Sequence, residues 1–99
     1  MTINKMLNED TVTLALEGRI DTATSPALQA AILEAFQSAR NLVLDFEKVP
    51  YISSAGLRAL LIGQKTAASK GGKMELTHVS EMVYSILETV GFTDILTLR

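Results

Sequence analysis

Residues 45–57 read Asp-Phe-Glu-Lys-Val-Pro-Tyr-Ile-Ser-Ser-Ala-Gly-Leu. The short apolar run 42–44 precedes them, which is typical of a central strand that is buried on both faces. Pro50 breaks this strand, and a helical pattern follows over about residues 54–70. The stretch therefore predicts a strand-to-helix connection, which is the edge where open α/β sheets usually place their functional sites.

On both sides of this connection, strand patterns alternate with helical patterns. Because strands that alternate with helices favour parallel pairing with right-handed crossovers, the chain is expected to be one α/β domain over residues 1–99 with a mostly parallel central sheet. The expected element order is β-β-α-β-α-β-α-β. The remaining elements are expected at about 2–7 and 11–17 (strands), 26–39 (helix), 73–78 (strand), 80–90 (helix) and 95–98 (short strand or tail).

The ends of the three helices carry recognisable signals. Ser25 is expected to cap the first helix with Pro26 at its first position, and Ser80 is expected to cap the third. The pair Gly71-Gly72 and the single Gly91 are suited to left-handed C-caps at the ends of the second and third helices.

Composition excludes several classes of function. The 99 residues have a net charge of −2, and the basic residues are scattered rather than clustered, which argues against a nucleic acid partner. The chain has no cysteine and one histidine, so we expect neither a metal site nor a cofactor. No signal peptide pattern or long apolar run is present, which predicts a cytoplasmic protein without direct membrane insertion.

Ser54 stands where the second helix should begin. As an N-cap it could accept a hydrogen bond from the amide of Gly56 or Leu57, which is worth about 1 kcal/mol. The adjacent Ser53 supplies more hydroxyl than one cap requires, and the small Ala55 and Gly56 leave room for a partner or a phosphate. A helix N-terminus also stabilises added negative charge. These features favour an exposed, modifiable serine over a residue that only caps the helix.

The chain resembles the STAS domain family, named after sulfate transporters and anti-sigma factor antagonists. Residues 49–61, VPYISSAGLRALL, are similar to the family signature, in which an aromatic and an apolar residue precede Asp-Ser-Ser/Thr-Gly and an aliphatic residue. Residues 18–21 and 24–28 resemble a second family motif, and residues 71–74 and 90–92 resemble later landmarks. The resemblance covers essentially the whole chain.

The resemblance implies an anti-sigma factor antagonist without enzymatic activity. In its unphosphorylated form such a protein binds an anti-sigma factor that is also a serine kinase of the GHKL ATPase type, and so frees a sigma factor. Phosphorylation of one serine dissociates the two proteins, and a serine phosphatase resets the switch. The family phosphoacceptor falls on Ser54.

The signature departs from the family at two positions. Ser53 occupies the place of the family Asp, and Ala55 occupies that of the following Ser/Thr. Loss of the carboxylate could alter kinase recognition, and Ser53 is itself a second candidate for phosphorylation.

The family resemblance also suggests a partner-binding surface. Asp21 matches an acidic residue that lies near the switch serine in the family, although an Asp at this place can equally serve to form a turn. Leu57 and Arg58 begin the second helix, and leucines at helical spacing are more often core than surface. The expected partner-binding residues are Asp21, Thr22, Ser53, Ala55, Gly56, Leu57 and Arg58.

Two other functions compete with the switch. A hydrolase elbow would need glycine two residues before the serine, where Ile52 stands, and His78 follows a different strand. The second alternative is a STAS interaction subunit of a lipid-transport or stress-sensing complex that is not phosphorylated.

Overall fold

The computed structural model describes residues 1–99 and confirms the expected order of elements. The helices begin and end within a few residues of the predicted positions, and a short 3-10 helix, η1, precedes the last strand. The elements are β1 (Thr2–Asn8), β2 (Thr11–Glu17), α1 (Ser25–Ser38), β3 (Asn41–Lys48), α2 (Ser54–Ser69), β4 (Lys73–Thr77), α3 (Glu81–Thr89), η1 (Phe92–Asp94) and β5 (Thr97–Leu98).

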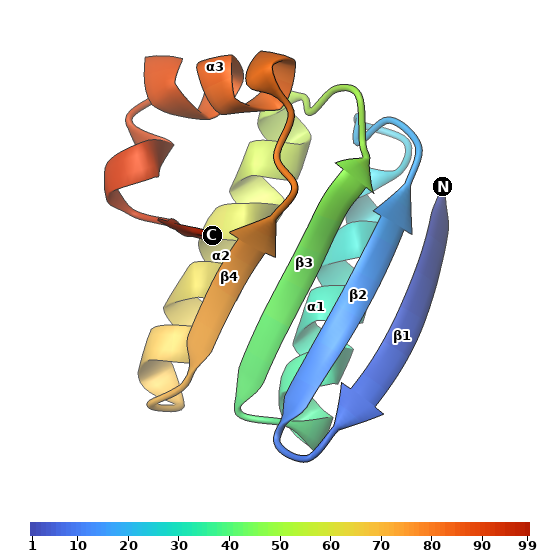
Figure 1. Ribbon diagram of the computed structural model, residues 1–99, viewed down its shortest axis with the longest axis vertical. Coiled ribbons are helices and arrows are strands. Elements are labelled where there is room, and N and C mark those ends of the chain that lie inside the picture. Colours follow the sequence, from blue (N-terminus) through green and yellow to red (C-terminus); the bar gives the residue numbers. More distant parts are fainter.

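The strands form one five-stranded sheet in the order β1-β2-β3-β4-β5 (Figure 1). β1 and β2 pair antiparallel as a hairpin, whose turn includes Glu9 at a φ of 57°. All other neighbours pair in parallel, so the prediction of a mostly parallel sheet is confirmed. The carboxyl ends of β2, β3 and β4 therefore lie at one edge of the sheet.

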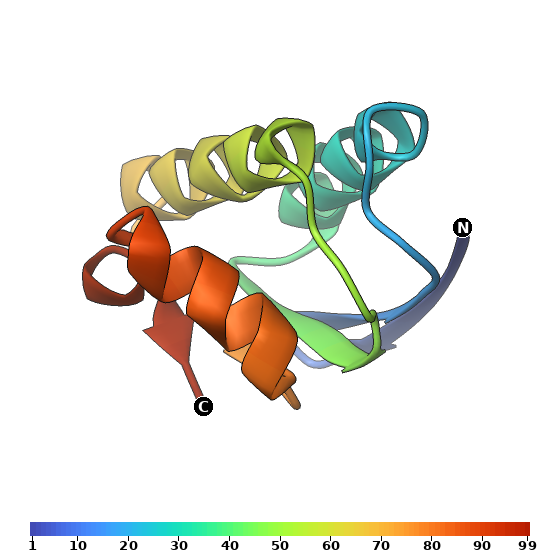
Figure 2. The ribbon, with the colours of Figure 1, turned by 90° about the horizontal axis from the view of Figure 1, so that it is seen from above.

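The sheet is covered unequally. Figure 2 shows α1 and α2 side by side over one face, while α3 lies near the carboxyl end of β4. Val12, Leu14 and Leu16 of β2 point to the helices and are at most 2% exposed, whereas the residues between them are half-buried. In β3, Leu42 and Leu44 are fully enclosed, and Val43 on the opposite face is also buried.

The capping predictions are confirmed at α3 and corrected at α1. Ser80 Oγ accepts from the amide of Val83 at 3.2 Å, and Gly71 and Gly91 adopt positive φ angles of 70° and 80° after their helices. Ser25 is not the cap of α1 but its first residue, because Thr24 already has helical backbone angles and its carbonyl accepts from Leu28. Thr24 occupies the N-cap position, but its hydroxyl donates to the carbonyl of Arg19 instead of capping the helix. None of the helices is long and apolar enough to cross a membrane.

Candidate functional site

Two loops at the carboxyl edge of the sheet are joined by backbone hydrogen bonds. The amide of Gly18 donates to the carbonyl of Lys48 at 3.0 Å, and that of Ile20 donates to Tyr51 at 3.0 Å. The amide of Ser53 then donates to the carbonyl of Ile20 at 2.8 Å. The structure thus brings the segment before α1 against the segment before α2, as a short parallel continuation of the β2 and β3 pairing.

Close packing beneath the two loops depends on Gly56. Ile20 and Ile52 are at most 1% exposed and face the first turn of α2. A Cβ atom on Gly56 would lie 2.5 Å from Ile20 Cγ2 and 2.7 Å from Ile52 Cγ1, which is too close for carbon atoms. The absence of a side chain at Gly56 therefore lets α2 begin directly against the joined loops.

Ser53, rather than Ser54, caps α2. Ser53 has extended backbone angles, with φ −91° and ψ 174°, and its Oγ accepts from the amide of Gly56 at 3.4 Å. The prediction that Ser54 is the N-cap is wrong, because the amide of Ser53 is held by Ile20 and the chain becomes helical only at the next residue. A capping side chain comes from the last non-helical residue, which is Ser53.

Ser54 is the first residue of α2, and its side chain is exposed, as predicted for a modifiable serine. Its hydroxyl makes no hydrogen bond within the protein. The backbone amides of Ser54 and Ala55 also lack an acceptor, as is usual in the first turn of a helix. These amides and the dipole of a 16-residue helix make the surroundings of Ser54 favourable for negative charge.

Asp21 has the turn-forming role in this structure. Its Oδ1 accepts from the amides of Ala23 and Thr24, each at 3.0 Å, and lies 3.1 Å from Thr24 Oγ1. The amide and hydroxyl of Thr24 hold the pKa of the Asp21 carboxyl below its usual value, with smaller effects from the Ala23 amide and the charge of Arg19. Asp21 Oδ2 takes part in none of these bonds.

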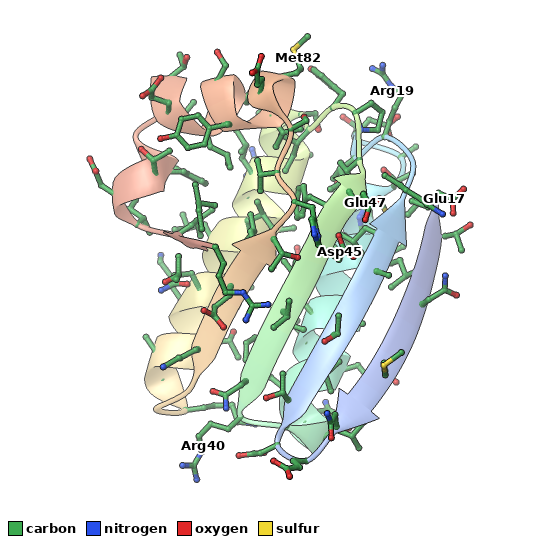
Figure 3. The ribbon with its side chains drawn as sticks, in the orientation of Figure 1. Glu17, Arg19, Arg40, Asp45, Glu47 and Met82 are labelled. Atoms are coloured by element: carbon green, nitrogen blue, oxygen red, sulfur yellow. The ribbon has the colours of Figure 1, made fainter.

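An arginine and a tyrosine form a further link that we did not predict from the sequence. The guanidinium carbon of Arg19 lies 4.6 Å from the centroid of the Tyr51 ring, a cation–π geometry that joins the same two loops on their outer side. Figure 3 shows Arg19 at the edge of the sheet, pointing away from the body of the protein. The available signal was the presence of a basic and an aromatic residue in the two motif segments.

The residues predicted to bind a partner differ in their exposure. Thr22, Ser54 and Arg58 are exposed, and Asp21, Ser53 and Ala55 are half-buried. Gly56 and Leu57 are buried, Leu57 with 7% of its surface exposed, because the first turn of α2 packs against the core. These two residues can therefore support the site from inside but do not form its outer surface.

A second polar cluster lies at the ends of β3 and β4. Potential ligand atoms of Asp45, Glu47 and His78 all lie within 4.8 Å of one another. Figure 3 shows Asp45 and Glu47 near the end of β3. His78 Nδ1 is 3.1 Å from Asp45 Oδ1, which also accepts from the Glu47 amide at 3.0 Å. These contacts hold the Asp45 carboxylate between the His78 ring and the Glu47 amide.

Comparison with known proteins identifies relatives over nearly the whole chain. The family model described as "STAS domain" matches residues 2–99. A protein of Bordetella bronchiseptica named "Putative anti-sigma factor antagonist BtrV" is 32% identical over 81 residues, which are 81% of this chain and 70% of the relative.

Solved structures share the fold at lower identity. An anti-sigma factor antagonist from Mycobacterium paratuberculosis superposes with a TM-score of 0.87 at 22% identity, covering 99% of this chain and 84% of the other. The anti-sigma factor antagonist SpoIIAA in its unphosphorylated form gives a TM-score of 0.83 at 21% identity, with 99% and 88% covered. The phosphorylated form of SpoIIAA, from Bacillus, gives 0.76 at 20% identity, with 99% and 91% covered.

Proposed function

The chain belongs to the STAS domain family, and from that premise we propose that it is a cytoplasmic anti-sigma factor antagonist formed by one STAS domain over residues 1–99. In its unphosphorylated form it binds an anti-sigma factor that is also a serine kinase of the GHKL ATPase type, and so frees a sigma factor. Phosphorylation at Ser54 releases the kinase, and a serine phosphatase restores the binding form.

The observation that carries this proposal is the difference between the two adjacent serines. Ser53 Oγ is half-buried and accepts a hydrogen bond from the amide of Gly56. Ser54 Oγ is exposed and makes no hydrogen bond. A kinase can therefore reach Ser54 without opening the first turn of α2, which supports Ser54 over Ser53 as the phosphoacceptor.

Ser53 also bears on the departure from the family signature. Serine and aspartate are comparably good N-caps, so Ser53 preserves the start of the helix at the position of the family Asp. What the replacement removes is a negative charge next to Ser54. The proposed kinase therefore meets the same backbone geometry with one carboxylate fewer.

The proposed release acts through charge at the interface. A phosphate adds about −1.5 to −2 charges at neutral pH. Beside the free amides of Ser54 and Ala55 this charge is locally favourable, so the domain itself keeps its fold. A partner surface shaped to fit a neutral hydroxyl would instead have to desolvate a dianion, which can cost about 4 kcal/mol, or roughly a thousandfold in affinity.

The position of the histidine favours a binding protein over a hydrolase. His78, the single histidine of the chain, is bonded to Asp45 on a neighbouring strand and makes no contact with Ser54. His78 is therefore not positioned as a general base for the Ser54 hydroxyl.

The test is phosphorylation with a candidate kinase. The protein is incubated with ATP and a candidate GHKL-type serine kinase from the same organism, and the modified residue is mapped by mass spectrometry. One phosphate is expected on Ser54, absent in Ser54→Ala and retained in Ser53→Ala. Modification at another residue, or in Ser54→Ala to the same extent, would contradict Ser54 as the acceptor.

A second candidate is suggested by Ser53 at the position of the family Asp. In this alternative the chain is a STAS interaction subunit of a lipid-transport or stress-sensing complex, and Ser54 stays unmodified. Stable co-purification with transporter subunits, without phosphate at any serine, would favour this function.

A further inference from the structure

Arg58 is an exposed arginine without a partner. Arg40 lies 3.9 Å from Asp10 and Arg99 lies 3.6 Å from Glu75. Arg19 stacks on Tyr51. Arg58 makes no ion pair, side-chain hydrogen bond or cation–π contact, so its charge is available for a group that comes from outside the folded chain.

Arg58 lines a partly apolar groove between the first halves of α1 and α2. The volume of the groove is about 350 Å³, and Arg58 is the only charged residue that lines it. The same groove reaches Ala55, the residue next to Ser54. The other lining residues are Ser25, Pro26, Gln29, Ala30 and Leu33 of α1. A partner segment that pairs an apolar side chain with a carboxylate would fit this combination.

The spacing along α2 connects Arg58 with Ser54. Residues four apart lie on the same face of a helix, and an acidic group N-terminal to a basic one is the favourable orientation. The next basic residue of α2 is Lys65, about three turns from Ser54. Arg58 is therefore the basic side chain of α2 that a phosphate on Ser54 can reach.

We propose that Arg58 contributes to the effect of Ser54 phosphorylation on partner binding, because the phosphorylated form loses a contact that Arg58 makes in the unphosphorylated complex. While Ser54 carries a hydroxyl, Arg58 pairs with a carboxylate of the anti-sigma factor whose neighbouring apolar side chain occupies the groove. When Ser54 carries a phosphate, Arg58 turns to it along the helix and is withdrawn from the partner. This inference rests on the proposed function and names the regulation of the same site.

The pairing of Arg58 with the phosphate can be tested without a kinase or a partner. Phosphoserine is incorporated at residue 54 during translation, and the phosphate is titrated by ³¹P NMR. A nearby guanidinium favours the dianion, so its second pKa should be about 0.3 lower in the otherwise wild-type protein than in Arg58→Gln. Arg40→Gln, at the other end of the domain, is the control and should leave the titration unchanged. An equal second pKa of the phosphate in the protein with Arg58 and in Arg58→Gln would overturn the proposed pairing.

The proposed contact between Arg58 and the partner is tested by titrating the protein with the anti-sigma factor kinase and measuring the affinity. Unphosphorylated Arg58→Gln should bind about tenfold more weakly than wild type, because a partner carboxylate loses its counter-charge. Arg58→Gln that binds as tightly as wild type would overturn the proposed carboxylate contact. If phosphorylation leaves wild-type binding unchanged while the ³¹P difference persists, the proposed function fails and the pairing of Arg58 with the phosphate stands.

Discussion

The amide of Ser53 donates a hydrogen bond of 2.8 Å to the carbonyl oxygen of Ile20. This bond joins the residue that caps α2 to the residue directly before Asp21. Two segments about thirty residues apart in the sequence thus meet at the carboxyl edge of the sheet, and the exposed Ser54 follows directly after the bond that joins them.

Replacement of each serine by alanine should separate capping from switching. Ser53→Ala removes the acceptor for the Gly56 amide and should lower the free energy of unfolding by about 1 kcal/mol. Ser54→Ala removes an exposed hydroxyl without a bond and should change it by less than about 0.5 kcal/mol. Urea unfolding followed by circular dichroism measures both, and the opposite ranking would assign the cap to Ser54.

Gly56→Ala should disturb the junction of the two loops. The new methyl group would collide with Ile20 and Ile52, and such overpacking typically costs about 1–3 kcal/mol, although alanine favours the helix. Hydrogen exchange of the Ser53 amide should become faster as its bond to Ile20 weakens.

Gly63→Ala is the matched control on the same helix. Its methyl group would meet Met74 Sδ at 2.7 Å and Ile32 Cγ2 at 2.9 Å, away from the loops. It should lower stability without weakening the Ser53 bond selectively. Equal effects of the two variants on exchange at Ser53 would contradict a special role of Gly56 in the junction.

The lowered pKa of Asp21 makes a pH-dependent contribution to stability. Because the folded-state pKa lies below the unfolded value of about 3.8, the contribution is complete at pH values above 3.8 and is lost as the pH falls through the folded-state value. Asp21→Asn should therefore show a shallower loss of stability than wild type below pH 3.8. Parallel unfolding curves of the two proteins through this range would show that the carboxylate has no such role.

Two replacements of Asp21 should distinguish its role in forming the turn from the role of its negative charge in partner binding. Asn keeps an oxygen that can accept from Ala23 and Thr24, whereas Ala removes it, so Asp21→Ala should be less stable than Asp21→Asn near neutral pH. If the free Oδ2 meets the partner, both variants should bind the anti-sigma factor more weakly than wild type. If Asp21→Asn binds with the affinity of the wild type, the charge of Asp21 does not contribute to partner binding, and its role is limited to forming the turn.

Periodicity and turn residues were sufficient to predict the order of elements and the parallel sheet. The alternation in residues 11–17 and the breaks at Pro50, Gly71 and Gly91 are local signals, and the structure uses each as expected. Local signals could also predict that a helix starts near Ser54. They could not select between two adjacent serines, which are equally good caps.

The missed features of the site depend on contacts between distant segments. The bond from Ser53 to Ile20 holds the last residue before α2, and it joins residues that no local pattern connects. The same applies to the stacking of Arg19 on Tyr51. Thr24 rather than Ser25 occupies the N-cap position of α1, and its hydroxyl donates to the carbonyl of Arg19 at 2.8 Å.

The most direct test of the account is the affinity of the anti-sigma factor kinase for the protein with serine or phosphoserine at position 54, measured by calorimetry, with amide NMR spectra of both forms. The account predicts binding that is about a thousandfold weaker for the phosphorylated form. It also predicts amide shifts confined to the first turn of α2 and the loop around Asp21. Equal affinities of the two forms would contradict it.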